Sequence, residues 1–522
     1  MKKLISVLLC LAMLMSLVAC DNKKTPAPDN AQSGDASQEA GEPTGGEEQS
    51  GSETEASAID FDEDPYTLNV CYAVLGEAQP DLAMIEEKLN EITLKEINCK
   101  VKLEAVSLFS LANIYALKAS SQEKMDLMIL FPGSSYLAEF ANNNMLMPIE
   151  DYVDQWGSDI KEVLGDMISA GEYDGHTYAI AQNRNLRKNE NGFNISKQYC
   201  DKYNIDPNSI KTLEDLEAVF DMMKEKEPNV ISVMPETTGG GIAGTLADYY
   251  DSLGTRGVAL EEQADGKLKV IPITQQKSVI AACAKVREWY EKGYISKDVL
   301  TDQDGGAAGL QTGKCLASAA NSLQPASGDR WSYAVRIHDE RPLLSTSDDQ
   351  LILWGVASSC ARPDKAIQFL NLCYASADIA NLMMNGVEDV HYKVLENGAI
   401  DNSMNENYQN YWPMFGDFFK QYIRQGDIDL SDATTPEEYT EILLSWKVEL
   451  SPAYGFNFNP ANVKTEVAGV TAVSDEYMLP IFNGTVDPVT EIPKWEEKMM
   501  AAGLQTVIDE MQSQMDAWVA AK

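Results

Sequence analysis

Hydrophobic positions in the first part of the chain switch repeatedly between the period of a strand and that of a helix. Apolar side chains occupy alternate positions from Thr67 to Val74, which predicts a buried strand. The same alternation predicts a strand at 101–105, and the apolar run at 126–131 predicts a third strand, with a helix at 108–119 between the two. A further helix-spaced set is Leu82, Ile85, Leu89 and Ile92. The resulting β-α-β-α-β order implies a parallel sheet with helices on both faces.

Open sheets of this kind bind ligands at the loops that follow the carboxyl ends of their strands. Two segments occupy such positions, Gly76 to Gln79 and Gly133 to Tyr136. We therefore expect both segments to be loops of a binding edge.

The middle of the chain predicts a crossing into a second α/β unit. A short helix is expected around Trp156, and Asp174-Gly175 is typical of a tight hairpin turn. Residues 181–191 are polar and without period, as expected of a crossing segment. Thr212 and Asp215 then have the spacing of a capping box, which predicts the start of a helix.

The remaining pattern continues this second unit and returns to the first. Strands are expected at 230–234 and 351–358, and the segment 310–320 reads as a helix or a strand around a turn at 312–314. One helix is expected from Val279 to Tyr290, and another opens at Pro363. The C-terminal segment 493–518 is apolar along one helical face, which predicts an amphipathic helical region.

The N-terminus has the layout of a secretory signal. Lys2 and Lys3 precede an apolar run that ends in Leu17-Val18-Ala19-Cys20. This ending resembles the bacterial lipobox, in which the cysteine is lipidated and becomes the mature N-terminus. A membrane-spanning anchor is the alternative, but the run is short for a span and a polar tract follows it directly. We therefore expect residues 1–19 to be a signal peptide and Cys20 to carry lipid, including palmitate.

Composition limits the class of protein. Residues 20–64 contain almost no large apolar side chain, so we expect a disordered acidic tether behind the lipid. At 522 residues and 44% hydrophobic, the chain fits a multi-domain globular protein rather than a polytopic membrane protein. The formal net charge of -40 repels phosphate backbones, so nucleic acid is not an expected partner.

Motifs for catalysis or cofactor binding are weak. Gly239 to Gly244 matches G-x-G-x-x-G. A dinucleotide site requires these glycines directly after a strand, but here four residues separate them from the preceding strand. The three histidines lack metal-ligand spacing, and the cysteines left after Cys10 and Cys20 form no close pairs. Several of these cysteines lie in apolar contexts, and we expect those to pack as small hydrophobic side chains. No cofactor, metal or catalytic residue is predicted, although a carboxylate pair of a glycoside hydrolase remains open among 81 acidic residues.

Aromatic and amide residues in predicted loops and crossings point to a neutral, hydroxyl-rich ligand. A sugar ring has an apolar face that stacks on aromatic rings and a polar rim that bonds planar amides. Core packing is the alternative for each of these side chains. If Trp354 is a core residue, its replacement by alanine should lower the free energy of unfolding by roughly 3–5 kcal/mol. The candidate ligand-binding residues are Tyr136, Asn183, Arg184, Trp331, Trp354, His391, Tyr392, Tyr411 and Trp412.

Several segments together resemble extracellular solute-binding proteins of bacterial ABC importers, in particular the carbohydrate-binding group. They are the lipobox with its tether, Asp126 to Tyr136, Tyr173 to Ile180 and Thr212 to Leu216. That group usually has Lys and Pro where this chain has His176 and Ala181. A lipoprotein subgroup with an extended C-terminal region is similar at 385–392, 451–458 and 484–488, although Asp389 stands where the subgroup usually has glycine.

The resemblance implies a two-lobe periplasmic-binding-protein-like fold of type II, with an α/β sheet and flanking helices in each lobe. The implied division is 65–182 for the first part of lobe 1, 183–345 for the first part of lobe 2, and 346–522 for return segments and C-terminal helices. A hinge of several crossings would let the lobes close on a solute, most naturally an oligosaccharide. The implied partners are that solute and the transmembrane subunits of an ABC permease, with membrane contact only through the lipid anchor and the chain acting as a monomer.

Two other classes stay open at the level of sequence. A cell-surface glycoside hydrolase would turn over the sugar, whereas a sensor would pass ligand information to a receptor rather than to a permease.

Overall fold

The computed structural model describes residues 59–74, 78–183, 191–237, 240–320, 331–337, 343–408, 415–429, 433–445 and 448–522. All of them belong to one unit of the chain, Ala56–Lys522. The predicted signal peptide, Cys20 and almost all of the tether lie outside the described residues. None of the described helices combines the length and the apolar character that a membrane crossing requires.

The first lobe is built on a five-stranded sheet with the order β2-β1-β3-β14-β6. Its strands are β1 (Tyr66–Val74), β2 (Cys99–Ser107), β3 (Leu127–Leu130), β6 (Ala179–Ala181) and β14 (Leu353–Val356). β1, β2 and β3 are parallel, as the β-α-β-α-β pattern predicted, whereas β14 is antiparallel to both β3 and β6. Leu130 and Ala181 both pair with Leu353. The ends of β1, β2, β3 and β6 therefore lie along one side of the sheet, which we call the carboxyl edge.

Helices cover this sheet because each buries one apolar face against it. Ile85 and Leu89 of the first helix and Tyr115 of the second are fully buried. The helices are α2 (Leu82–Ile97), α3 (Leu111–Ser121), α4 (Gly133–Asn142), α5 (Glu150–Trp156), α6 (Ser158–Leu164), α13 (Pro363–Ala375) and α14 (Ala377–Asn385). The hairpin of β4 (Glu172–Tyr173) and β5 (His176–Thr177) has its turn at Asp174-Gly175, as predicted.

The segment Gly133 to Tyr136 is not the loop that the sequence predicted. It is the first turn of α4, which begins two residues after Phe131. Pro132 has extended backbone angles, and the Gly133 N–H donates to the carbonyl of Leu351 at 3.2 Å. These two features turn the chain directly from the strand into the helix. The other predicted loop, 76–79, lies partly outside the described residues.

The second lobe has a four-stranded sheet with the order β12-β7-β11-β8. Its strands are β7 (Gly192–Ser196), β8 (Ile231–Pro235), β11 (Cys315–Ala320) and β12 (Ser332–Val335). Its helices are α7 (Lys197–Tyr203), α8 (Leu213–Lys226), α9 (Ile242–Leu246), α10 (Lys277–Lys292) and α11 (Gly306–Thr312). The predicted capping box opens α8, because the Asp215 N–H donates to Thr212 Oγ1 and the Asp215 carboxylate accepts from the Thr212 N–H.

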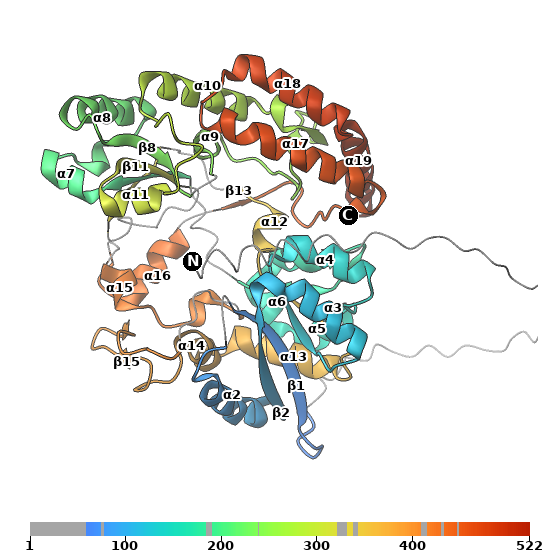
Figure 1. Cartoon of the computed structure of the whole chain (residues 1–522). Helices are drawn as coiled ribbons and strands as arrows, with labels where there is room; N and C mark the ends of the chain where they lie inside the picture. Colours follow the sequence, from blue (N-terminus) through green and yellow to red (C-terminus); the bar gives the residue numbers. More distant parts are fainter. Residues whose placement is uncertain are drawn as a thin grey trace, which may run out of the picture. The chain divides into compact units, whose positions relative to one another are not determined.

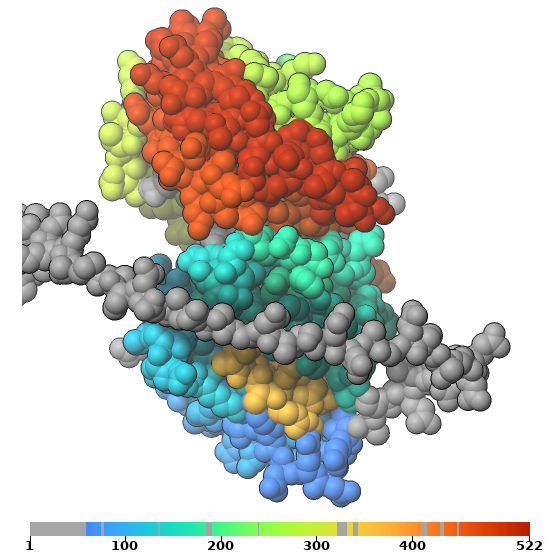
Figure 2. Space-filling view, turned by 90° about the vertical axis from the view of Figure 1, so that its right-hand side faces the viewer, coloured from blue at the N-terminus to red at the C-terminus, as the bar shows by residue number. Residues whose placement is uncertain are grey.

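The C-terminal helices complete the core of the second lobe. They are α17 (Lys464–Phe482), α18 (Pro488–Ala501) and α19 (Leu504–Ala521), and α19 also packs on the hairpin of β9 (Val258–Glu262) and β10 (Leu268–Pro272). The predicted segment 493–518 is thus two helices, which separate where Gly503 takes a φ of +105°. Figures 1 and 2 show the C-terminal helices in red against the green residues of this lobe.

Segments from late in the chain join the lobes. α12 (Thr346–Asp349) follows β13 (Leu343–Leu344), which pairs in parallel with β17 (Glu449–Leu450). Ser451 Oγ donates to the Asp251 carboxylate at 2.5 Å, and the Gly455 N–H donates to Thr346 Oγ1 at 2.9 Å. Buried side-chain hydrogen bonds of this kind hold the crossings in register with both lobes.

A small separate cluster is formed by the part of the chain between α14 and the segment 448–460, which we call the last crossing. It contains β15 (Lys393–Val394), β16 (Ile400–Asp401), α15 (Gln425–Asp429) and α16 (Pro436–Ser445) around a core that includes Ile428, Tyr439 and Leu443. The cysteines behave as predicted in the part of the chain that the structure describes, where seven are buried and unpaired. Burial raises the pKa of thiols such as Cys71, to about 12, so they stay protonated.

Candidate functional site

The carboxyl edge of the first lobe carries two of the predicted ligand-binding residues. Tyr136 lies in the first turn of α4, half-buried, and its ring stacks on Phe140 with centroids 5.2 Å apart. Asn183 follows the end of β6 and its side-chain amide donates to the Asp417 carboxylate at 2.7 Å. Backbone bonds from Asn183 to Gly416 and from Phe418 to Asn183 strengthen this contact. Burial raises the pKa of Asp417, and the bonds from Phe419 N–H and Asn183 oppose that rise.

Trp354 lies in the core, which contradicts the expectation that it faces a ligand. Its side chain is 1% exposed and stacks on Phe415 with centroids 4.5 Å apart. β14 runs between β3 and β6, so its side chains point to the two covered faces of the sheet and not to its edge. Core packing is therefore the correct alternative for this residue.

Trp331 lies at the side of its sheet opposite to the carboxyl ends of β8 and β11. The carboxyl ends of β8 and β11 share a side with Gly192 and Val335, as the strand register shows. Trp331 precedes β12, and its carbonyl accepts from the Lys197 N–H at the opposite side. The sequence could not reveal the side on which Trp331 lies. That side depends on the antiparallel direction of β12 relative to β7, which is set by tertiary pairing.

His391 and Tyr392 are buried and hold the chain rather than line a surface. The Val387 N–H donates to His391 Nδ1 at 2.9 Å, so Nε2 carries the proton and donates to the Asp81 carboxylate at 3.1 Å. A Cβ at Gly386 would come within 2.6 Å of Nδ1, which explains the glycine there. The motif at 385–392 thus ties the last helix of the first lobe to the start of α2. Arg184, Tyr411 and Trp412 lie outside the described residues.

Asp389 lies in the same turn and has a backbone conformation that suits glycine. Asp389 has a φ of +62°, a left-handed conformation that glycine adopts without a steric penalty. We expect Asp389→Gly to raise the free energy of unfolding by about 0.5 kcal/mol, since relief of strain exceeds the added entropy of the unfolded chain. Asp389→Ala keeps the strain and is the matched control. Chemical denaturation measures both, and a lower stability of the glycine variant than of the alanine variant would contradict this explanation.

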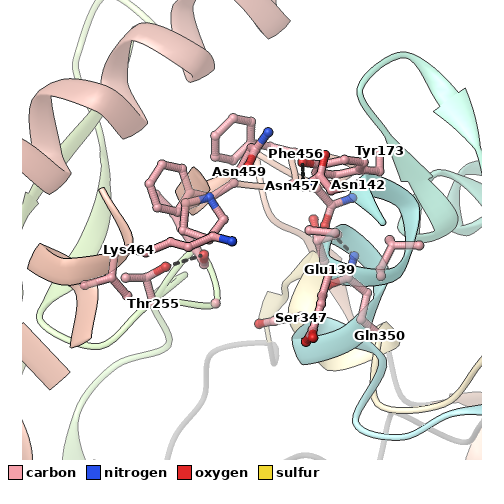
Figure 3. Close-up of a pocket in the computed structure, with 18 of the residues that line it drawn as sticks. Glu139, Asn142, Tyr173, Thr255, Ser347, Gln350, Phe456, Asn457, Asn459 and Lys464 are labelled. Carbon is pink, nitrogen blue, oxygen red and sulfur yellow. Dashed lines mark hydrogen bonds between the residues drawn. The ribbon is translucent and has the colours of Figure 1, made fainter. Parts of the chain in front are cut away.

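A pocket of about 590 Å³ lies where the two lobes meet. The first lobe contributes α4 and Tyr173, the second lobe contributes the loop around Thr255 and the start of α17, and the crossings contribute α12 and the segment 456–460 (Figure 3). The pocket follows α4 away from the carboxyl edge. Gln350 lies near that edge, whereas Asn142, Asn143 and Tyr173 lie toward the opposite ends of the strands, where Leu146 bridges Ala357. Its lining residues with aromatic or amide side chains are Asn142, Asn143, Tyr173, Gln350, Phe456, Asn457, Phe458 and Asn459.

Hydrogen bonds fix the wall of this pocket. Asn142 Nδ2 donates to the Tyr173 hydroxyl at 2.8 Å, and burial raises the pKa of that phenol, so it stays neutral. Gln350 Nε2 donates to the carbonyl of Ala170 at 2.8 Å and also bonds Asn457. The Asn457 amide in turn bonds the carbonyl of Glu172. The amides that connect the crossings to the first lobe are therefore already oriented before a ligand arrives.

The charged groups of the pocket come from opposite sides. Glu139 on α4 and Lys464 at the start of α17 are both exposed and face the pocket from different lobes (Figure 3). The other lining carboxylate, Asp251, is buried and accepts from Ser451 Oγ and the Leu253 N–H. Among the residues that the structure describes, no group of three His, Cys, Asp or Glu side chains is placed to hold a metal ion. The lining thus favours stacking and hydrogen bonding with an uncharged polar molecule.

Comparison with known proteins decides the family. The family described as bacterial extracellular solute-binding protein matches residues 82–378, and a domain of unknown function matches residues 452–520. The chain belongs to the bacterial extracellular solute-binding proteins. A carbohydrate ABC transporter substrate-binding protein of Streptococcus pneumoniae is 22% identical over 457 residues, which are 85% of this chain and 90% of that relative.

Solved structures show the same fold. An N-glycan transport solute-binding protein from Streptococcus pneumoniae has a TM-score of 0.71 at 20% identity, over 87% of this chain and 99% of that one. A human-milk-oligosaccharide-binding protein from Bifidobacterium longum infantis has a TM-score of 0.57 at 15% identity, with 87% and 99% covered. The two-lobe fold of this solute-binding protein is therefore the one that the resemblance implied.

The sequence identified little of the pocket in advance. Tyr173 and the segment 451–458 supported the resemblance but were not named as ligand contacts, because nothing in their local pattern separates them from core residues. Gln350, Tyr173 and Phe458 come from segments far apart in the chain, and only the fold brings them together. A usable signal was the dense run of aromatic and amide residues in Tyr454-Gly455-Phe456-Asn457-Phe458-Asn459.

Proposed function

We propose that this protein is the substrate-binding component of an ABC importer for oligosaccharides. It captures the sugar in the interlobe pocket of Figure 3 and delivers it unchanged to the transmembrane subunits of a permease. Family membership supports the binding role, and the names of the relatives support the transporter and the class of solute.

The observation that carries the proposal is that both lobes line one pocket together with the crossings. A ligand in such a place makes contacts in the closed arrangement that it cannot make with either lobe alone. It shifts the equilibrium between open and closed arrangements by the free energy of those extra contacts. A closed, loaded form is what a permease could distinguish from the empty protein.

The lining fits the chemistry of a sugar. The half-buried ring of Phe458 offers an apolar face, Tyr173 and Phe456 line the pocket as largely buried side chains, and the neighbouring amides offer donors and acceptors for hydroxyl groups. The net charge of -40 disfavours a strongly anionic ligand. A neutral oligosaccharide satisfies both conditions.

The lipobox supports a place on the outer face of the cytoplasmic membrane. Lipid on Cys20 would anchor the protein, and the acidic tether would leave the body mobile near the permease. The chain would then work as a monomer beside its permease.

The proposal is tested by calorimetry on residues 59–522 with EDTA present. The probes are a mannose–N-acetylglucosamine disaccharide, Man5GlcNAc, kestose and human milk oligosaccharides, the kinds of glycan named for the similar structures. We expect one glycan to bind per chain and to be recovered intact. Steady release of shorter sugars would instead identify a hydrolase. Binding without any effect of the protein on uptake by the neighbouring permease would favour a sensor.

Phe458 provides a direct test of the pocket. Its ring is half-buried and lines the pocket from the last crossing. We expect Phe458→Ala to weaken glycan binding by about tenfold or more, as for an aromatic anchor at the centre of a binding site. Val489→Ala on α18 is the control, because Val489 is 78% exposed and does not line the pocket, and it should leave the affinity unchanged. Equal affinities of the two variants would remove the pocket from the ligand site.

A further inference from the structure

Three side chains near the end of the chain contact the last crossing. They are Gln514 and Trp518 of α19 and Lys522 directly after it, and the spacing of four residues puts them on one face of the helix. Trp518 packs edge-on against Phe456 with ring centroids 5.8 Å apart, and Lys522 Nζ donates to the carbonyl of Tyr454 at 3.2 Å. The end of α19 therefore lies along the segment whose residues 456–460 line the interlobe pocket.

Gln514 holds both backbone groups of one pocket-lining residue, Asn459. The Asn459 N–H donates to Gln514 Oε1 at 2.8 Å, and Gln514 Nε2 donates to the Asn459 carbonyl at 2.9 Å. A side-chain amide that bonds the donor and the acceptor of one residue fixes the backbone orientation at that point. Phe458, whose half-buried ring lines the pocket, directly precedes Asn459 and is held by the same contact.

The first lobe holds the same segment from its other side. The Asn457 amide bonds the carbonyl of Glu172 and also bonds Gln350. Residues 456–459 thus lie between the first lobe and α19, which packs with the helices and the hairpin of the second lobe. The position of this wall of the pocket depends on contacts from both lobes.

We propose that the domain of unknown function at residues 452–520 is a module that builds and positions one wall of the interlobe pocket. Its first residues supply the wall, and its last helix holds the wall in the binding conformation through Gln514. This inference rests on the proposed function. A wall that is ordered in advance spares the ligand the entropic cost of ordering it. Gln514 is a positioning residue, because it acts through Asn459 and Phe458 and does not itself line the pocket.

Gln512 is a matched control in the same helix. The Val270 N–H donates to Gln512 Oε1 at 2.8 Å, and Gln512 Nε2 donates to the Leu268 carbonyl at 3.0 Å. Each glutamine also donates to a carboxylate four residues away on α19. The two side chains therefore make the same kinds of bond, but Gln512 holds the β9–β10 hairpin, which does not line the interlobe pocket.

The test compares Gln514→Met with Gln512→Met by calorimetry on residues 59–522, with the tightest-binding glycan of the panel. Methionine keeps the length of the side chain and removes its bonds to the backbone. Gln514→Met should weaken glycan binding by about tenfold, because the ligand must then order the wall. Gln512→Met should leave the affinity unchanged, although both variants should lower the unfolding midpoint by similar amounts.

A double variant separates positioning from a general loss of stability. Because Gln514 acts through the ordered ring of Phe458, Gln514→Met should weaken binding much less in a Phe458→Ala background than in the wild type. Equal affinities of the two glutamine variants, or an undiminished effect of Gln514→Met in the Phe458→Ala background, would refute the positioning role while the effect of Phe458→Ala still supports the pocket. If the wild-type protein binds no glycan of the panel, the proposed function fails and this inference with it.

Discussion

Trp354→Ala should lower the free energy of unfolding by about 3–5 kcal/mol. The indole is fully buried on the strand that runs between β3 and β6, and its stacked partner Phe415 comes from a segment some 60 residues later in the chain. Truncation removes the buried apolar surface and leaves a cavity that rigid strands on both sides cannot close. The effect is large because helices cover both faces of this sheet.

Chemical denaturation of residues 59–522 measures the loss. Trp331→Ala is the control of equal size, because Trp331 is 40% exposed at the far side of the other sheet and should cost clearly less. The Trp354→Ala protein that remains folded should bind glycan with normal affinity. Normal stability together with a large loss of affinity would return Trp354 to the ligand site and contradict its place in the core.

Cys20→Ser should release the protein from the membrane into the soluble fraction. The lipobox resemblance predicts that lipid on Cys20 is the anchor, and the tether behind it has no apolar stretch that could hold a bilayer. No helix among the described residues is long and apolar enough to cross a membrane. We therefore expect release to be nearly complete.

Fractionation of cells followed by immunoblotting measures the release. Cys10→Ser is the matched control, because Cys10 lies within the apolar run of the signal and is removed with it, so this variant should stay anchored. A Cys20→Ser protein that remains fully membrane-bound would show that the N-terminal segment is a membrane span and not a lipoprotein signal.

Local sequence predicted the elements whose signals are local. The capping box of Thr212 and Asp215 opens a helix because both bonds form within one turn. Asp174-Gly175 closes a hairpin because both residues take the positive φ that a tight turn requires, +50° and +80°. The parallel order of β1, β2 and β3 followed from alternation with helices.

Features that depend on distant pairing were out of reach of the sequence. β14 joins the middle of the first sheet from more than 200 residues after β3, and its place between β3 and β6 decides that Trp354 is core. The contact of Gln514 with Asn459 depends on where α19 packs and not on the neighbours of either residue in sequence. The resemblance supplied the two-lobe plan, but the pocket residues became visible only when the crossings were placed beside α4.

The most direct test of interlobe capture is small-angle X-ray scattering of residues 59–522 during titration with the tightest-binding glycan of the panel. Closure predicts that the radius of gyration decreases, with the same midpoint as the calorimetric titration and with one glycan bound per chain. Phe458→Ala should shift both midpoints together to higher glycan concentration. A glycan that saturates the protein while the radius of gyration stays constant would contradict capture between the lobes.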